Sequence, residues 1–388
     1  MKIHDRYALT RVINAAGAFT PLGVSRSSAA VGRAAGEALG EFFVMDELQE
    51  AAGAAIARLS GGEAGAVTHC VAAAITLCVA AAVAGGAAAR VAALPDTTGM
   101  PTRVVIPAGH VIDYGHSILQ AIRLAGATPV VAGSERRCTI EDLEAELAHG
   151  ETAPDETAHG ETAPDETAQD ETACLLLVSS RLTRGEAVDL AGAVAAAHRR
   201  GVPAIVDGAA QDLRIGELLA TGADLVLVSA QKYLAAPTAG LVIGRADLVA
   251  AVRAHEKGIG RAMKASKEAI CGVLAAIEER EATDPAAWQR AQDEKVAGFV
   301  RRAETLPGVG AAVVADPTGA PFSRARLTIV PTRAGMDAAA LAQALMSGTP
   351  PVWVMKQGLD EGQVNLELVP LHAGEVETIL ARLAEILV

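Results

Sequence analysis

Between residues 100 and 245, short apolar runs alternate with segments of helical periodicity. The apolar runs predict buried strands at residues 103–108, 127–133, 174–179, 202–209 and 223–231. The intervening segments predict helices at residues 113–126, 138–148, 186–201 and 215–222. Such alternation is typical of a mostly parallel sheet that is covered on both faces. One more apolar run, at residues 238–245, follows so closely that we expect it to return as a strand beside its predecessor.

The flanking regions have other patterns. Residues 1–28 are rich in small and turn-forming residues and predict an extended arm, residues 29–59 predict a helix, and residues 64–69 predict a short strand. The stretch from Val71 to Ala89 carries no charge, but it is mostly Ala and contains two glycines. It therefore predicts a helix buried in a globular domain rather than a membrane span.

The last part of the chain predicts a small α+β domain. Its pattern is mostly helical at residues 265–305, gives separated strands at residues 324–331, 352–357 and 363–370, and ends in an amphipathic helix at residues 374–388. The expected organisation is an N-terminal arm (1–28), a large α/β domain (29–257) and a small α+β C-terminal domain (258–388).

An acidic repeat interrupts the large domain at residues 149–173. It contains two copies of HGETAPDETA and a partial third copy, QDETA, with eight acidic residues and neither Lys nor Arg. Because it has no apolar face to bury, we expect a solvated loop insertion. A functional role as a charged segment is the less favoured alternative.

Charge and cysteine content exclude several classes of protein. The formal net charge is −13, which argues against a nucleic-acid partner because phosphate binding needs clustered Lys and Arg. The five cysteines are far apart and form no CxxC pair, which indicates reduced thiols rather than a disulfide framework or a zinc site. The N-terminus has no apolar signal region. We therefore expect a cytoplasmic protein with no metal and no membrane partner.

Two strand ends carry residues suited to catalysis. Asp207 directly follows the apolar residues Ala204, Ile205 and Val206, and Lys232 follows the buried run that ends near Ser229. Ligands of open parallel sheets lie outside the carboxyl ends of the strands. A neighbouring amine and carboxylate are what pyridoxal 5'-phosphate (PLP) chemistry requires: the amine binds the cofactor, and the carboxylate keeps its pyridine nitrogen protonated. Taken singly, Asp207 is more often a helix cap and Lys232 a solvated lysine.

Nearly the whole chain resembles one branch of the PLP-dependent fold type I enzymes, that of bacterial selenocysteine synthase and its relatives, which include ammonia-lyases of amino-sugar acids. The sequence RVINAAGAFTPLGVSR at residues 11–26 is similar to the N-terminal signature of that branch. The most specific matches are LPDTTGMPTRVVIPAGH at residues 94–110 and GIGRAMKASKEAI at residues 258–270. VDGAAQ and SAQKYLAAPTAGLVIGR resemble the cofactor motifs. The resemblance implies the transferase fold of these enzymes, with a mostly parallel sheet in the large domain.

The resemblance also implies roles for individual residues. Lys232 would be the Schiff-base lysine, Asp207 the partner of the pyridinium nitrogen, and His110 the residue that stacks on the ring. The phosphate would be held by the turn His69-Cys70-Val71 at the start of the Ala-rich helix, with support from Ser229 and Thr238.

An amino-acid substrate also needs a group that binds its carboxylate. Arg324 and Arg326 are candidates because a guanidinium can grip a carboxylate bidentately. Arg26 and Arg261 are further candidates from the resembling motifs, and Arg261 with Lys264 and Lys267 would suit a phosphorylated substrate. As a non-functional alternative, Arg324 and Arg326 are solvent-facing charges of a strand.

Two departures from the family pattern bear on the substrate. The small residues usual in the phosphate turn are replaced by His69, Cys70 and Val71, and the glycines usual around the lysine are replaced by Ala230, Gln231 and Tyr233. Backbone donors survive a change of side chain, so these differences affect the substrate class more than cofactor binding.

The implied reaction is an α,β-elimination on an amino acid or amino-sugar acid. Lys232 removes the Cα proton, a β-substituent leaves, and hydrolysis gives a 2-keto acid and ammonia. The same first proton transfer would serve a racemase or epimerase, and the sequence does not separate these reactions. A selenium or sulfur transferase is less favoured, because the chain is acidic and starts at the arm with no tRNA-binding region ahead of it. A non-catalytic binding protein on this fold is the alternative of another class, and we expect a homodimer or larger homo-oligomer.

Overall fold

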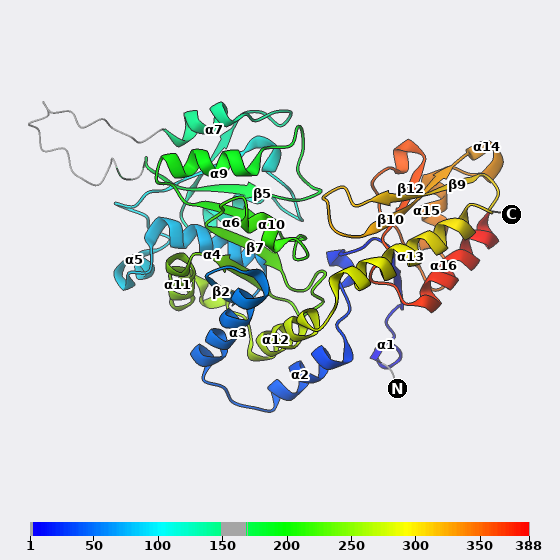
Figure 1. Cartoon of the computed structure of the whole chain (residues 1–388), viewed down its shortest axis with the longest axis horizontal. Coiled ribbons are helices and arrows are strands. Elements are labelled where there is room, and N and C mark those ends of the chain that lie inside the picture. Colours follow the sequence, from blue (N-terminus) through cyan, green and yellow to red (C-terminus); the bar gives the residue numbers. More distant parts are fainter. Residues whose placement is uncertain (1–2, 149–167, 169, 388) are drawn as a thin grey trace, which may run out of the picture. The chain divides into compact units, whose positions relative to one another are not determined.

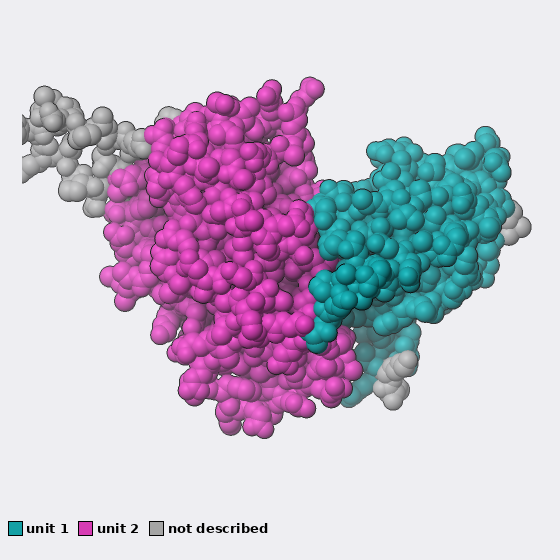
Figure 2. Space-filling view, in the orientation of Figure 1, with its two compact units in different colours: residues 1–26, 282–388 teal, residues 27–281 magenta. Residues whose placement is uncertain are grey.

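The computed structural model describes residues 3–148, 168 and 170–387. Within these residues the chain divides into two compact units. Unit 1 comprises residues 1–26 and 282–388, and unit 2 comprises residues 27–281 (Figure 2). Most of the acidic repeat, residues 149–167 and 169, lies outside the described residues, so the predicted loop insertion stays a prediction.

Unit 2 is built on a sheet whose seven described strands have the order β2-β8-β7-β6-β5-β3-β4. The strands are β2 (Ala64–Thr68), β3 (Arg103–Pro107), β4 (Thr128–Ala132), β5 (Thr172–Val178), β6 (Ala204–Asp207), β7 (Leu225–Ser229) and β8 (Gly240–Gly244). Strands β4, β3, β5, β6 and β7 pair in parallel, whereas β8 pairs antiparallel with β7 and β2. The mostly parallel sheet, with residues 238–245 returning beside their predecessor, is confirmed.

Helices cover both faces of this sheet (Figure 1). Alternate side chains of the inner strands enter two separate cores, as in β6, where Val206 enters one and Ile205 the other. The first core packs against α3 (Met45–Ser60), α7 (Ile140–Leu147), α9 (Leu190–Arg199), α10 (Ile215–Leu219) and α12 (Lys267–Glu281). The second core packs against α4 (Val71–Ala84), α6 (Leu119–Leu124) and α11 (Ala246–Ala254). This explains why the strands are apolar throughout. The short helix α5 (Ala88–Ala93) follows α4.

Helix α4 is the Ala-rich segment predicted to be buried, and nearly all of its side chains are buried. Small side chains allow it to lie close to the sheet and to α6 and α11. Among the helices in the described ranges, none is both long and apolar enough to cross a bilayer.

Unit 1 contains two small sheets. Strands β9 (Val309–Ala315), β10 (Ser323–Ile329) and β12 (Gln363–Leu366) form an antiparallel sheet with β10 in the centre, and β1 (Ile13–Asn14) pairs in parallel with β11 (Val352–Trp353). Helices α13 (Pro285–Ala303), α15 (Ala338–Met346) and α16 (Ala373–Ile386) enclose the core of this unit. The short helices α1 (Ile3–Arg6) and α14 (Pro331–Ala334) complete it. The α+β character predicted for the C-terminal part is confirmed.

Two local expectations were wrong, and one strand was missed. Residues 29–59 form two helices, α2 (Ala29–Leu39) and α3, because the chain leaves the helix at Gly40. The helix expected over residues 113–126 is confined to α6, since residues 113–117 form a tight turn. Strand β9 was not foreseen. The units also divide the chain between residues 281 and 282, so residues 258–281 fall in unit 2 rather than in the expected C-terminal part.

Candidate active site

Asp207 and Lys232 lie at the same edge of the large sheet. Asp207 is the last residue of β6, and its Cα lies opposite Leu227 of the parallel neighbour β7. Lys232 lies in the turn after β7, where its N–H donates to Ser229 O at 3.1 Å and its carbonyl accepts from Ala235 N–H at 3.2 Å. Two adjacent parallel strands thus deliver a carboxylate and an amine to one place.

The two side chains influence each other electrostatically. Asp207 is only 3% exposed, and burial raises its pKa to about 6 against the opposing effect of the Lys232 charge. Burial lowers the pKa of Lys232, because it disfavours the charged amine, while the charges of Asp207 and Asp212 raise it. Asp207 Oδ1 also accepts from Ala209 N–H at 2.9 Å. The amine is therefore more easily deprotonated than an ordinary lysine.

An ion pair between buried Asp212 and partly buried Arg280 holds the turn that carries Lys232. Asp212 pairs with Arg280 of α12 at 3.3 Å, and its Oδ1 accepts from Tyr233 N–H at 3.3 Å. Arg280 also donates to Tyr233 O at 2.7 Å. Both backbone groups of Tyr233 are thus bound, which limits the movement of the neighbouring Lys232. Sequence reasoning missed Asp212 and Arg280.

His110 lies directly after β3, in the short 3-10 helix η2 (Ala108–His110), and is 4% exposed. Its Nδ1 accepts from Val178 N–H, at the end of β5, at 3.0 Å. The neutral ring therefore carries its proton on Nε2. Burial lowers the pKa of His110 to about 4, so the ring is neutral at physiological pH.

The predicted phosphate turn connects β2 to α4. Thr68 Oγ1 donates to Cys70 O at 3.1 Å, and Cys70 is the N-cap of α4 in an extended conformation, with φ −161°. A Cβ on Gly240 would lie 2.5 Å from the carbonyl carbon of Cys70, so only glycine fits there. None of His69, Cys70 and Val71 has a positive φ, so the larger side chains fit the turn without backbone strain.

The donors of this turn differ from the expectation in one respect. His69 is exposed, and its N–H donates to Met263 O at 2.8 Å, so this backbone donor is already bound. The N–H groups of the first turn of α4, beginning at Val71, have no partner within the helix. An anion would therefore be met by the start of α4 rather than by all three turn residues.

Ser229 and Thr238 lie on either side of Lys232 in the chain. Ser229 is the last residue of β7, is 4% exposed, and its N–H donates to Ala209 O at 3.0 Å. Thr238 is exposed just ahead of β8. Their expected role near a phosphate stays a prediction.

In unit 1, Arg324 is engaged by two buried carboxylates. The guanidinium is paired with Asp316 and lies 3.1 Å from Glu367 Oε2, and all three side chains are almost wholly buried. The alternative of Arg324 as a solvent-facing strand charge is therefore wrong. Arg326, on the same strand, is partly buried and donates from Nε to Asn365 Oδ1 at 3.1 Å.

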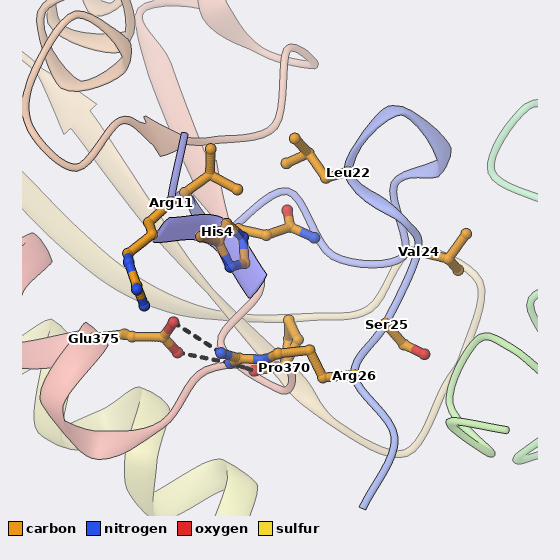
Figure 3. A pocket seen from close by; sticks show the side chains of 10 residues that line it. His4, Arg11, Leu22, Val24, Ser25, Arg26, Pro370 and Glu375 are labelled. Carbon is orange, nitrogen blue, oxygen red and sulfur yellow. Dashed lines mark hydrogen bonds and ion pairs between the residues drawn. The ribbon is translucent and has the colours of Figure 1, made fainter. Parts of the chain in front are cut away.

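Arg26 lines a cavity of about 480 Å³ in unit 1 (Figure 3). Its guanidinium forms a bidentate pair with Glu375, at 2.9 and 2.7 Å, and also donates to Pro370 O. Arg11 and His4 line the same cavity, and Arg11 pairs with Asp5 at 2.7 Å. Each arginine of this cavity therefore already has a carboxylate partner.

Arg261 lies in a cavity of about 330 Å³ in unit 2 that adjoins the phosphate turn. Lys264 lines the same cavity and forms a β-bridge with Thr68, next to His69. The lining residues are Val44, Met45, Asp46, Gln49, Arg253, Glu256, Lys257, Arg261, Lys264 and Ala265. Four of them are basic and two are acidic, so the cavity suits an anion. Lys267 does not line it and instead donates to the backbone carbonyls of Leu39 and Glu41.

Tyr114 is a further residue of this region that sequence reasoning missed. Burial raises its pKa to about 12, and the charges of Asp207, Cys70 and Asp113 add to the rise. It therefore lies within electrostatic reach of both the carboxylate at β6 and the start of α4.

In the part of the chain that the structure describes, no group of three or more His, Cys, Asp or Glu side chains is arranged to hold a metal ion.

Sequence comparisons give two full-length relatives. The chain is 35% identical over 387 residues to a 5'-C-glycyluridine monooxygenase-decarboxylase from Streptomyces sp, covering 99% of this chain and 92% of the relative. It is 33% identical over 388 residues to a D-glucosaminate-6-phosphate ammonia lyase from Salmonella typhimurium, covering 99% of this chain and 97% of the relative. The family model of L-seryl-tRNA selenium transferase (SelA) matches residues 205–287, which include Asp207, Lys232 and Arg261.

Structure comparisons agree with the sequence. A solved structure of D-glucosaminate-6-phosphate ammonia-lyase superposes with a TM-score of 0.85 at 31% identity, and covers 100% of this chain and 98% of that chain. A serine palmitoyltransferase from Sphingomonas wittichii superposes with a TM-score of 0.57 at 16% identity, over 97% of this chain and 87% of that chain. The second likeness shows the fold alone.

Proposed function

The chain belongs to the SelA-like family of PLP-dependent enzymes, and from that premise we propose that it is a PLP-dependent lyase that releases ammonia from an amino-sugar acid. The observation that carries the proposal is that buried Asp207 and Lys232 follow adjacent strands and act electrostatically on each other. The full-length similarity to an ammonia lyase of a phosphorylated amino-sugar acid supports the substrate class.

The donor set fits PLP. An amine of lowered pKa suits covalent attachment to an aldehyde, and a buried carboxylate suits a pyridinium nitrogen. The start of α4 supplies N–H groups and a positive helix end for the phosphate. When bound, PLP supplies an electron sink that stabilises negative charge at the substrate Cα.

Each residue then has a physical task. Asp207, once it faces a positive nitrogen, is held ionised and keeps that nitrogen protonated. His110 is neutral and held by Val178 N–H, so it offers a flat, uncharged surface to stack on the ring. Lys232, with its lowered pKa, is free after the substrate binds to take the Cα proton. Loss of the β-substituent gives an enamine, which hydrolyses to a 2-keto acid and ammonia.

The basic cavity beside the phosphate turn is our proposed site for a phosphate group of the substrate. Arg261 and Lys264 line it, and both are exposed to solvent rather than buried. A guanidinium and an ammonium together suit a phosphate dianion.

Among the arginines of unit 1, Arg326 is freer to bind a carboxylate than Arg324 and Arg26. Arg324 is already held between Asp316 and Glu367, and Arg26 is held by Glu375. The described bond of Arg326 uses only Nε, and it joins an amide rather than a carboxylate. We assign Ser229 and Thr238 to the support of the cofactor phosphate.

We also propose a homodimer in the cytoplasm. The segment from Leu39 to Met45 exposes large apolar side chains, among them Phe42, which is fully exposed, and Val44 at 62%. Exposed apolar groups gathered in one segment are typical of a protein interface. The described cysteines are free, as expected in a reducing compartment.

Oxidative decarboxylation is a second candidate reaction, favoured by the 35% identity to the monooxygenase-decarboxylase. It begins at the same substrate carbon but consumes oxygen and releases CO₂.

The experiment is to incubate the PLP-loaded enzyme with amino-sugar acids, with and without a phosphate group, and to measure ammonia, 2-keto acid, oxygen uptake and CO₂. Ammonia and keto acid without oxygen uptake support the lyase, and coupled oxygen uptake and CO₂ release support the second reaction. Inversion at Cα without either would support a racemase, and Lys232→Ala must abolish whichever reaction is seen.

A further inference from the structure

Tyr114 lies in a tight turn just after His110. Asp113 and Ser117 form a β-bridge, and Gly115 N–H donates to Asp113 Oδ1 at 2.8 Å. Gly115 has φ 122°, a conformation that favours glycine. The Tyr114 ring packs edge-on against His116, with ring centroids 5.0 Å apart. The turn and the ring contact, rather than a hydrogen bond of its hydroxyl, orient the phenol.

The hydroxyl of Tyr114 is shielded from water and has no hydrogen-bond partner among the described residues. A buried tyrosine hydroxyl normally has a partner, because a donor removed from water without one costs free energy. Phenylalanine would fill the same space without this cost. A ligand that supplies the missing acceptor would explain the hydroxyl.

The surroundings identify the kind of acceptor. Tyr114 packs against the apolar core that contains Val71, the first residue of α4, where we place the cofactor phosphate. One backbone donor expected in that turn, His69 N–H, is bound to Met263 O. A side-chain donor beside the turn would replace it. Asp207 and Asp113 are carboxylates near the phenol; they add to its raised pKa, and we assign Asp207 to the pyridine nitrogen.

We propose that the Tyr114 hydroxyl donates a hydrogen bond to the phosphate group of PLP. The inference rests on the proposed function, since it adds a positioning residue to the same cofactor site. Burial keeps the phenol protonated over the physiological range, so it acts as a donor. A bond from a neutral donor to a charged phosphate is stronger than one between neutral groups.

The test compares wild type with Tyr114→Phe, which removes only the oxygen. The dissociation constants of PLP and of pyridoxal, which lacks the phosphate, are measured by titration of the visible absorption band. We expect the affinity for PLP to fall by about tenfold in the variant and that for pyridoxal to be unchanged. Tyr7→Phe is the matched control, because Tyr7 is 58% exposed, and it should leave both constants unchanged.

A second readout is thermal unfolding of the cofactor-free protein. Tyr114→Phe should unfold at the same or a higher temperature than wild type, because a buried hydroxyl without a partner is removed. A lower unfolding temperature would mean that the hydroxyl has a structural partner, and would overturn the inference. An equal loss of affinity for PLP and pyridoxal, or no loss for either, would also overturn it. If wild type binds neither compound, the proposed function itself fails, which is a distinct result.

Discussion

The charges of Asp207 and Lys232 oppose the effect of burial on each other's pKa. Burial raises the pKa of Asp207 and lowers that of Lys232, and the charge of each residue moves the pKa of the other back toward its ordinary value. The carboxylate closes β6, and the amine follows β7, its parallel neighbour. Without a cofactor, each is the main charged group that compensates the other. A ligand with a positive nitrogen at Asp207 and an aldehyde at Lys232 would satisfy both.

The raised pKa of Asp207 predicts a pH-dependent cost to stability. Burial raises this pKa from 3.8 to about 6, so the folded state favours the protonated form, and stability falls as the pH rises from about 4 through 6. In the cofactor-free protein at pH 8, Asp207→Asn should gain on the order of 2 kcal/mol in free energy of unfolding, and the gain should vanish below pH 4. Urea unfolding across this range measures it.

Asp360→Asn is the control for this experiment, because Asp360 is exposed. Its stability should follow wild type at every pH. A gain for Asp207→Asn that is constant with pH would contradict the assignment to ionisation. With PLP added, Asp207→Asn should lose activity by about a hundredfold or more, because the ring nitrogen loses its counter-charge.

The ion pair of Asp212 and Arg280 is predicted to hold the Lys232 turn. Arg280→Met leaves the buried Asp212 without its partner and should destabilise the protein by about 3 kcal/mol in urea unfolding. The double variant Asp212→Asn/Arg280→Met should recover part of this loss, because no uncompensated charge remains. If the double variant were no more stable than Arg280→Met, the loss would not come from the buried charge.

Gly240 is predicted to be essential for the phosphate turn. In Gly240→Ala the new Cβ would meet the backbone of Cys70 at 2.5 Å, so either the turn or β8 must shift. We expect a loss of about 2 kcal/mol in free energy of unfolding and a weaker affinity for PLP. Gly216→Ala is the control, since Gly216 lies in α10 with nothing within 4 Å of the added Cβ, and it should be neutral or slightly stabilising. Equal behaviour of the two variants would refute the steric argument.

Arg261 is predicted to recognise the substrate phosphate. Arg261→Ala should raise KM for a phosphorylated amino-sugar acid by about tenfold and leave KM for its unphosphorylated analogue unchanged. Arg290→Ala, at an exposed position of α13, should change neither value. A similar rise for both substrates would assign Arg261 to another part of the substrate.

Much of the fold was predictable because the central strands are continuous apolar runs. The structure and its relatives confirm the expected family and fold type I architecture. Strand β9 was missed because it is mostly exposed and pairs with β10 alone, so its sequence has no clear alternation. The break between α2 and α3 was missed because Phe42, Phe43 and Val44 continue the apolar pattern while lying exposed.

Of the candidate site, only the reactive side chains that directly follow a buried strand were predictable from the sequence. Asp207 and Lys232 follow buried runs, so topology alone brings them together. Asp212 and Tyr114 lie in loops, and their importance depends on contacts from elements far away in the chain. Alternation along β10 predicted that Arg324 and Arg326 share a face. It did not predict that Asp316 and Glu367, which follow the neighbouring strands, both pair with Arg324.

The central claim is that Lys232 binds PLP covalently. The purified protein is loaded with PLP, its visible absorption spectrum is recorded, and the adduct is reduced with borohydride and located by peptide mass spectrometry; Lys232→Ala is treated in parallel. The account predicts a visible band in wild type, its absence in the variant, and the reduced adduct on Lys232. A well-folded wild type without the band, or an adduct on another lysine, would contradict it.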